Sequence, residues 1–338
     1  MKKVGIGRRK KFQKLVTSVQ NTGHLLIEEG FNSMNLGMKH KQINLWDTDI
    51  LRNCRHPNIV QKQEVLLATS IITDQEFVFG ASDFDSIHQI LDHLVDYHKI
   101  SAVIGLGINS YLDSKVEIEK LPSSQIKFLN YLLKEHSLIG CRGLETLDFL
   151  IAYGFPHANL FLSGCPSLHL IQPSLKEVPS SLSRILVSGA LINHLDILDS
   201  MTTSNTKILA IPQTLESLSN MENVSKLDQR LEIFLPCSLR DWRTKIRKWN
   251  PELSVGTRFH GNVAAMSIGI TSVFISGDIR TRELSQLTGL PYVSDLLEVG
   301  TAIESIKETT QLNRPEIIQN LRSQIFQRLK SRDLINVS

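Results

Sequence analysis

The chain has 338 residues, of which 41% are hydrophobic and 21% are charged. This is the balance of a folded protein rather than a disordered or fibrous one, and the length favours two domains. A formal net charge of +3, with both signs interleaved, gives no reason to expect a nucleic-acid partner. No apolar stretch is as long as a membrane helix, and no apolar signal core follows the basic start, so we expect a cytoplasmic protein.

The amino-terminal segment is strongly basic and contains the run Arg8-Arg9-Lys10-Lys11. Such a run can make peripheral contact with an anionic membrane or another phosphate-bearing partner. It is also common in solvated chain ends. Both interpretations stay open at this point.

The four cysteines predict neither a metal site nor a disulfide framework. They lie far apart and form no CxxC pair, at Cys54, Cys141, Cys165 and Cys237. Reduced thiols fit this spacing best. No zinc-protease or phosphate-loop motif is present either, so we expect no metal and no cofactor.

In the first half of the chain, short apolar or β-branched runs alternate with segments of helical period, which is typical of βαβ units and a parallel sheet. We predict strands over residues 15–20, 102–106, 137–141 and 159–162. Apolar residues at helical spacing predict helices around residues 87–95 and 126–133. The stretch 44–84 has no clear pattern.

The second half repeats this alternation after a linker at residues 172–183 that is rich in Ser and Pro. We predict strands over residues 184–188, 208–211, 253–256 and 272–275, helices over 239–249 and 263–268, and a last amphipathic helix from Pro315 that packs back on the body. The fold class is therefore α/β, with two Rossmann-like, doubly wound domains at residues 1–175 and 176–338. The carboxyl ends of their strands should face a cleft, where such sheets bind ligands.

The segment Gly256-Thr257-Arg258-Phe259-His260-Gly261-Asn262 follows a predicted strand. In extended backbone, residues two apart share a face, so Arg258 and His260 should point the same way. Gly261 permits close backbone approach, and the next helix offers free N–H groups to an anion. The pattern indicates an anion-binding strand end with a titratable group. The alternative is structural, with Arg258 paired to a carboxylate and His260 at a helix start.

Arg142 has an equivalent place in the first half, directly after the strand predicted over 137–141. Thr146 follows one helical turn later, so both side chains can face the cleft. A surface Arg142 paired with Glu145 or Asp148 is the alternative.

Further candidate binding residues are Asn21, Gly23, Gly105, Gly107, Asp278 and Arg280. The two glycines at 105 and 107 form either a turn that lets the backbone approach a ligand or a plain turn. Asp278 and Arg280 follow a predicted strand and could bind sugar hydroxyls or an anion. Asp278 could equally cap the next helix.

Together these segments resemble the polysaccharide pyruvyl transferase family. Thr257-Arg258-Phe259-His260-Gly261, followed by an Ala-rich helix and a hydrophobic strand, is similar to the family's carboxyl-terminal signature. Arg142, Thr146 and the loop Gly164-Cys165-Pro166 resemble a second family segment, and Asn21 to Gly23 resembles its N-x-G-D loop. The chain departs from the family at His24 and Cys165, where acidic residues are common.

The resemblance implies a fold similar to glycosyltransferase type B and a pyruvyltransferase that uses phosphoenolpyruvate. Such an enzyme forms a ketal on a sugar of a polysaccharide or of its lipid-linked precursor and releases phosphate. Arg142 and Arg258 would bind the donor, with His260 as general acid. Two alternatives stay open, a nucleotide-sugar glycosyltransferase on a similar fold and an inactive scaffold.

Overall fold

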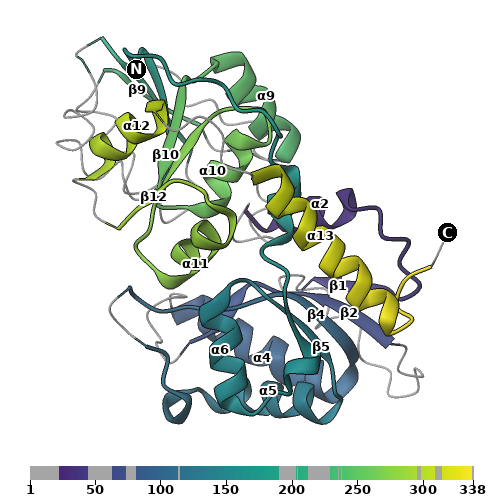
Figure 1. Cartoon of the computed structure of the whole chain (residues 1–338). Helices are drawn as coiled ribbons and strands as arrows, with labels where there is room; N and C mark the ends of the chain where they lie inside the picture. Colours follow the sequence, from purple (N-terminus) through teal and green to yellow (C-terminus); the bar gives the residue numbers. More distant parts are fainter. Residues whose placement is uncertain are drawn as a thin grey trace. The chain divides into compact units, whose positions relative to one another are not determined.

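The computed structural model describes residues 23–44, 63–73, 81–112, 115–189, 203, 205–211, 229–234, 236, 238–294, 298–308 and 314–336. Contacts divide the chain into two compact units (Figure 1). The Arg142 unit consists of Phe31–Pro166, Asp278–Leu287 and Glu316–Ser338, and the Arg258 unit of Met1–Gly30, Ser167–Gly277 and Thr288–Pro315. The units are thus built from interleaved stretches of chain. The boundary after residue 175 stays a prediction from the sequence.

The sheet of the Arg142 unit is parallel at every described strand pair and has the order β1-β2-β4-β5-β6, with β3 paired to β4. The strands are β1 (Lys41–Asn44), β2 (Gln63–Leu67), β3 (Ser70–Ile72), β4 (Lys99–Ile108), β5 (Leu138–Cys141) and β6 (Leu160–Leu162). The helices are α2 (Gly23–Ser33), α4 (Ala81–Tyr97), α5 (Ser123–Lys134), α6 (Leu144–Tyr153) and α13 (Arg314–Ser331), with 3-10 turns η2 (Ile118–Lys120) and η3 (His157–Asn159).

Both faces of this sheet are covered, as Figure 1 shows. Successive strand residues point to opposite faces, so Val103 of β4 packs toward α4, α5 and α6. Its neighbours Ala102 and Ile104 pack on the other face with Ile325 and Leu329 of α13. The predicted last helix therefore covers the second face of the sheet.

The sheet of the Arg258 unit is also parallel at every described pair, in the order β12-β11-β10-β7-β8-β9. Its strands are β7 (Arg184–Ser188), β8 (Lys207–Ile211), β9 (Leu231–Ile233), β10 (Leu253–Gly256), β11 (Ser272–Ile275) and β12 (Tyr292–Val293). Counted from β7, this is the Rossmann order 3-2-1-4-5-6. The order reverses between β7 and β10, and the carboxyl ends of these two strands border the crevice in which such sheets bind ligands.

Helices also cover both faces of this second sheet. One face packs against α12 (Val299–Glu308), and the other against α9 (Leu239–Trp249) and α10 (Phe259–Met266). The 3-10 turn η4 (Pro166–Leu170) precedes β7, and α11 (Ile279–Thr288) follows β11. The predicted α/β class with two doubly wound parallel sheets is confirmed.

Most predicted elements are present within a few residues of their expected ends. The strand predicted over residues 15–20 lies outside the described residues. The stretch without a clear pattern contains β2 and β3. The helix predicted from residue 263 begins four residues earlier, at Phe259, which changes the geometry of the motif described below.

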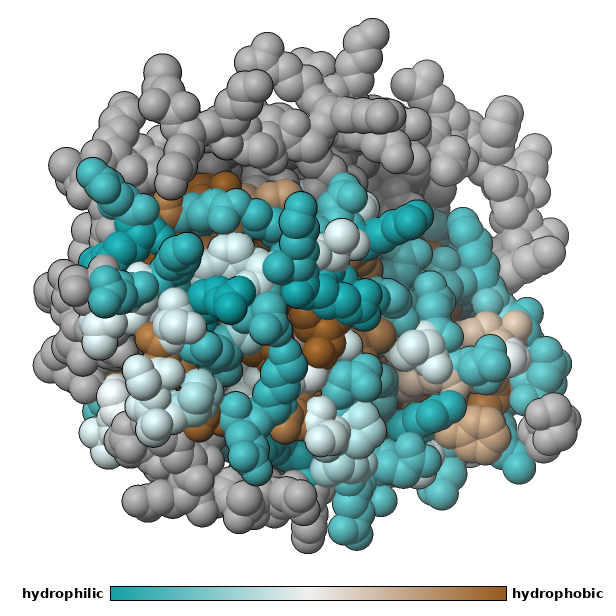
Figure 2. Space-filling model, turned by 90° about the horizontal axis from the view of Figure 1, so that it is seen from above, coloured by the Kyte–Doolittle hydropathy of each residue, from teal (hydrophilic) through white to brown (hydrophobic). Residues whose placement is uncertain are grey.

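Within the described ranges, no helix has both the length and the apolar character to cross a membrane. On the face drawn in Figure 2, the described residues form a mainly hydrophilic surface in which apolar residues occupy small patches. Small patches of this kind are ordinary on a protein surface.

The packing of α13 can be tested with two adjacent residues. Ile325 is fully buried against the sheet, whereas Phe326 is 37% exposed. Ile325→Ala should lower the free energy of unfolding by about 2–5 kcal/mol, because it leaves a cavity. Phe326→Ala should have a clearly smaller effect. Urea unfolding followed by circular dichroism measures both, and equal losses would contradict this packing.

Candidate functional site

The Arg258 motif forms the connection from β10 to α10. Arg258 is the residue before the helix, with extended backbone (φ −96°, ψ 111°), and α10 begins at Phe259. The prediction of extended backbone through His260 is therefore wrong. His260 lies in the first helical turn, where residues two apart do not share a face. The physical reason is Phe259, whose buried ring lies 5.0 Å from the Phe274 ring and anchors this turn on β11.

Asn262, the last residue of the motif, has a structural role. It is fully buried, and its Nδ2 donates to the carbonyl oxygens of Gly256 at 3.1 Å and Val273 at 3.0 Å. Its Oδ1 accepts from the Ser254 hydroxyl at 2.8 Å. A fully satisfied buried amide of this kind fixes its surroundings. Asn262 therefore ties β10, α10 and β11 together beneath the Arg258 turn.

Two glycines let the ends of β7 and β10 approach each other closely. A Cβ atom on Gly256 would lie 2.2 Å from the Ser188 carbonyl oxygen. One on Gly189, which has φ +80°, would lie 2.3 Å from Thr257 Oγ1 and 2.8 Å from Arg258 Cγ. Only glycine fits either position. Gly189 was missed in the sequence, where its signal is a glycine directly after a buried strand.

This arrangement presents two polar side chains at the point where the strand order reverses. Arg258 and His260 are both partly exposed. The first turn of α10 carries N–H groups that have no acceptor within the helix, and its dipole favours a negative ligand. The turn can therefore hold an anion, with a titratable imidazole next to it in the sequence.

Arg142 occupies the end of β5 in the other unit and is only 2% exposed. Its Nε donates to the Gly105 carbonyl oxygen at 2.8 Å, and its Nη2 makes a longer contact of 3.5 Å with that of Ala68. A Cβ atom on Gly107 would lie 2.9 Å from Arg142 Cδ. The alternative of a surface arginine paired with Glu145 is therefore wrong. The Gly105 and Gly107 backbone accommodates the Arg142 side chain.

Glu283 is a second buried charged residue at this edge of the sheet, 2% exposed. Its carboxyl group accepts from the Thr146 N–H at 3.2 Å and from the Thr146 hydroxyl at 3.0 Å. Thr146 lies in the first turn of α6, whose N-cap, Gly143, has no side chain. Glu283 thus supplies the acceptor that a capping side chain would normally provide. Gly143 leaves the room, because its Cβ would lie 2.6 Å from Glu283 Cβ.

Asp278 begins the segment that brings Glu283 to this unit. It accepts from the Thr281 N–H at 3.0 Å and from Arg280 Nη2 at 2.5 Å, so it both caps α11 and pairs with Arg280. Burial opposes its ionisation, but Arg280 and Thr281 outweigh this effect and lower the pKa of Asp278. Arg282 forms a bidentate pair with Glu145, at 2.8 and 2.9 Å from its two oxygens.

The Arg142 unit therefore brings together most of the predicted binding residues at the carboxyl ends of β4 and β5. These are Arg142, Gly105, Gly107, Thr146, Asp278 and Arg280. Arg280, Asp278 and Glu283 all act on Arg142 electrostatically, and burial together with Arg280 lowers the pKa of its guanidinium. Glu283 was missed, because a buried acid leaves no local pattern in the sequence.

The remaining predicted residues lie elsewhere. Arg258 and His260 belong to the Arg258 unit. Asn21 lies outside the described residues, and Gly23 is the first residue of α2.

The described cysteines and acids give no sign of a metal centre. Cys141 and Cys165 are free and fully buried, and burial raises the pKa of the Cys141 thiol. No group of three or more His, Cys, Asp or Glu residues in the described part of the chain could hold a metal ion.

A family comparison places both motifs in one context. Residues 39–279 match the family described as polysaccharide pyruvyl transferase. The chain belongs to the polysaccharide pyruvyl transferase family. The match includes Arg142, Arg258 and His260, and the family is one of transferases that act on saccharides. A search of curated proteins gives no match.

Solved structures support the fold. A Listeria monocytogenes protein assigned as a UDP-N-acetylglucosamine 2-epimerase is 10% identical, with a TM-score of 0.50 over 97% of this chain and 87% of that one. The UDP-N-acetylglucosamine 2-epimerase from Neisseria meningitidis is 10% identical, with a TM-score of 0.49 over 90% of this chain and 97% of that one. At such identities the likeness concerns the fold alone, which is similar to glycosyltransferase type B.

The protonation of Glu283 predicts a pH dependence of stability. Burial raises the pKa of Glu283 to about 8, although hydrogen bonds from Thr146 and the charge of Arg142 act in the other direction. The folded protein keeps this proton up to about pH 8, whereas an unfolded chain releases it near the ordinary value of 4.5. Because the folded state binds more protons in this window, the contribution of Glu283 to stability falls as pH rises through it.

Glu283→Gln should remove this contribution, since an amide has the same shape and no charge. The midpoint of thermal unfolding should fall by a few degrees less between about pH 6 and pH 9 in the variant than in the wild type. Glu145→Gln, which alters a partly exposed acid of the same unit, should keep the wild-type dependence. An unchanged pH dependence in Glu283→Gln would show that this proton is not held.

Proposed function

We propose that this protein transfers the pyruvyl group of phosphoenolpyruvate to a sugar of a polysaccharide, or of its lipid-linked precursor, in the cytoplasm. The observation that carries the proposal is the place of Arg258 and His260. They lie inside the family match, at the carboxyl end of β10 where the Rossmann order reverses. Ligands of such sheets bind at that point.

The donor carries a phosphate and a carboxylate on a small skeleton. A guanidinium group binds either anion through two parallel N–H donors. In the proposal Arg258 binds one anionic group with the help of the first turn of α10. Arg142 is the second anion-binding residue. Its buried side chain is already oriented by the Gly105 and Ala68 carbonyl oxygens, so binding would cost little conformational entropy.

Ketal formation starts with a proton added to the methylene carbon of phosphoenolpyruvate. The adjacent carbon becomes cationic, two hydroxyl groups of the sugar attack it, and the bond to phosphate breaks. Of the two hydroxyl protons released, one restores the acid and the other leaves with phosphate. We assign the acid to His260. The positive end of α10 disfavours imidazolium and a bound phosphate favours it, so we expect protonation to accompany donor binding.

His260→Ala should lower the turnover number at least about a hundredfold, because a positioned acid is lost, while phosphoenolpyruvate still binds in part. Phosphate release and product mass spectrometry, with a panel of galactosyl, mannosyl and aminosugar acceptors, measure this. His157→Ala, a change at an exposed histidine in η3, should leave turnover unchanged. Normal turnover of His260→Ala would refute the assignment.

Replacement of either arginine should weaken donor binding measured by calorimetric titration with phosphoenolpyruvate. Arg258→Ala tests the exposed residue. For buried Arg142, Arg142→Lys keeps the charge but loses the fork geometry, and thermal unfolding shows whether the variant is folded. Unchanged affinity in a folded variant would remove that arginine from the site. A nucleotide-sugar glycosyltransferase would instead transfer labelled sugar, and no labelled pyruvate, to the acceptor.

A further inference from the structure

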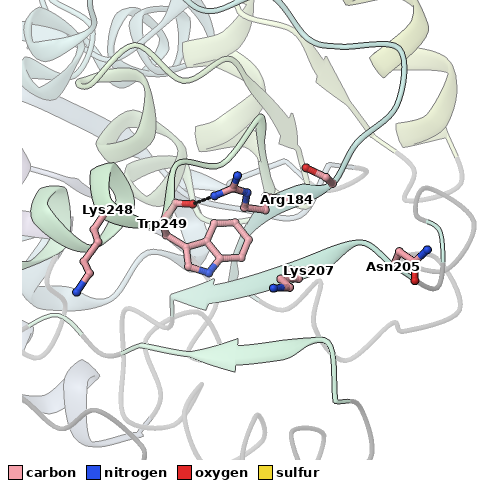
Figure 3. A pocket seen from close by; sticks show the side chains of 6 residues that line it. Arg184, Asn205, Lys207, Lys248 and Trp249 are labelled. Carbon is pink, nitrogen blue, oxygen red and sulfur yellow. Dashed lines mark hydrogen bonds between the residues drawn. The ribbon is translucent and has the colours of Figure 1, made fainter.

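The Arg258 unit has a basic pocket at the other end of its sheet. The pocket has a volume of about 480 Å³ and lies where β7 and β8 begin and α9 ends. It is lined by Ser183, Arg184, Asn205, Lys207, Lys248 and Trp249 (Figure 3). Arg258 follows β10, which pairs with β7 in parallel, so it lies at the opposite edge of the same sheet. A five-residue strand such as β7 is roughly 17 Å long, so the pocket is separate from the Arg258 turn.

The charges of this pocket are not neutralised in the way that those of the neighbouring surface are. Half of the described lining residues are cationic and none is acidic. On α9, Arg243 pairs with Glu29 and Lys245 with Glu232. By contrast, Lys207 and Lys248 form no ion pair with any acid that the structure describes. Both are exposed, so their ammonium groups are available to a ligand.

The nearest acid, Glu252, is already engaged by the backbone at the rim. Its carboxylate accepts from the N–H groups of Ser183 at 2.5 Å and Arg184 at 3.1 Å. Burial opposes its ionisation, but these hydrogen bonds outweigh that effect and lower the pKa of Glu252. Glu252 therefore orders the beginning of β7. The three cations of the pocket outnumber this single carboxylate.

Trp249 adds an aromatic surface to these cations. Its side chain is partly exposed, and its carbonyl oxygen accepts from Arg184 Nη1 at 3.0 Å. In Figure 3 the indole projects from the end of α9 beside the Arg184 guanidinium. A sugar ring can place its apolar C–H face on an indole while its charged substituents meet neighbouring cations. An aromatic ring with several cations therefore suits an acidic saccharide better than a neutral one or a bare anion.

We propose that this pocket is a binding site for saccharide units that carry a carboxylate or phosphate group. The identity of the polymer rests on the proposed function, since each pyruvyl ketal keeps its carboxylate and so makes the product acidic. A chain of several sugars is long enough to run from one edge of the sheet to the other. The pocket would hold units that are already acidic while another unit is modified.

The test is a binding titration without donor. The probes are a galacturonate oligosaccharide of four units, the corresponding neutral galactose oligosaccharide, a sugar 1-phosphate and UDP. We expect the galacturonate oligosaccharide to bind more tightly than the neutral one by about tenfold or more, and less tightly as salt rises. Equal affinity for the acidic and neutral oligosaccharides, or tightest binding of UDP, would overturn the proposal. Comparison with the sugar 1-phosphate shows whether carboxylate or phosphate is preferred.

Variants locate the site. The double variant Lys207→Glu and Lys248→Glu changes exposed side chains and should weaken galacturonate binding about tenfold or more. Arg247→Glu makes the same type of charge change at an exposed position of α9 that does not line the pocket, and should have little effect. If the double variant binds as the wild type does, the pocket is not the site. Because this assay needs no phosphoenolpyruvate, it can fail while pyruvyl transfer is confirmed, and the reverse also holds.

Discussion

The hydrogen bonds from Thr146 to Glu283 hold the Arg142 site together. They join the first turn of α6 to a helix 137 residues further along the chain, and they bring Asp278 and Arg280 to the strand end that carries Arg142. They also hold a buried carboxyl group whose pKa is raised to about 8. Near neutral pH, Glu283 is therefore mostly uncharged. Two arginines then face one carboxylate, that of Asp278, and the cluster keeps a positive charge for an anionic ligand.

The Arg258 unit positions its arginine by different means. There the fixed parts are uncharged: Gly189 and Gly256 let two strand ends meet, and Asn262 ties the turn to three elements. The side chains of Arg258 and His260 remain partly exposed. One unit thus presents a buried guanidinium held by backbone carbonyl oxygens, and the other an accessible one at a helix start. The first is set before any ligand binds, whereas the second can adjust to one.

The sequence predicts the fold better than it predicts the site, and the reason is physical. Strands such as β7 and β10 are short apolar runs, so burial on both faces of a parallel sheet is written in their composition. The strands β2 and β3 are separated by only two residues, yet both pair with β4, an arrangement that adjacency in sequence does not suggest. The start of α10 depends on the contact of Phe259 with Phe274, which no helical periodicity reveals. The family resemblance identified Arg142 and Arg258, but the burial of Arg142 depends on carbonyl oxygens far away in sequence.

Cys165 shows how one departure from the family pattern can be understood in these terms. Family members often have an acidic residue before the proline of this loop, where this chain has a fully buried thiol. Cys165 is close enough to act on the charge of Arg142, and a carboxylate in its place would neutralise much of the positive charge that the cluster retains. The thiol leaves that charge in place, while Asp278 alone balances the two arginines. In this chain the departure therefore favours the binding of an anion at Arg142, because it removes an internal competitor for the guanidinium.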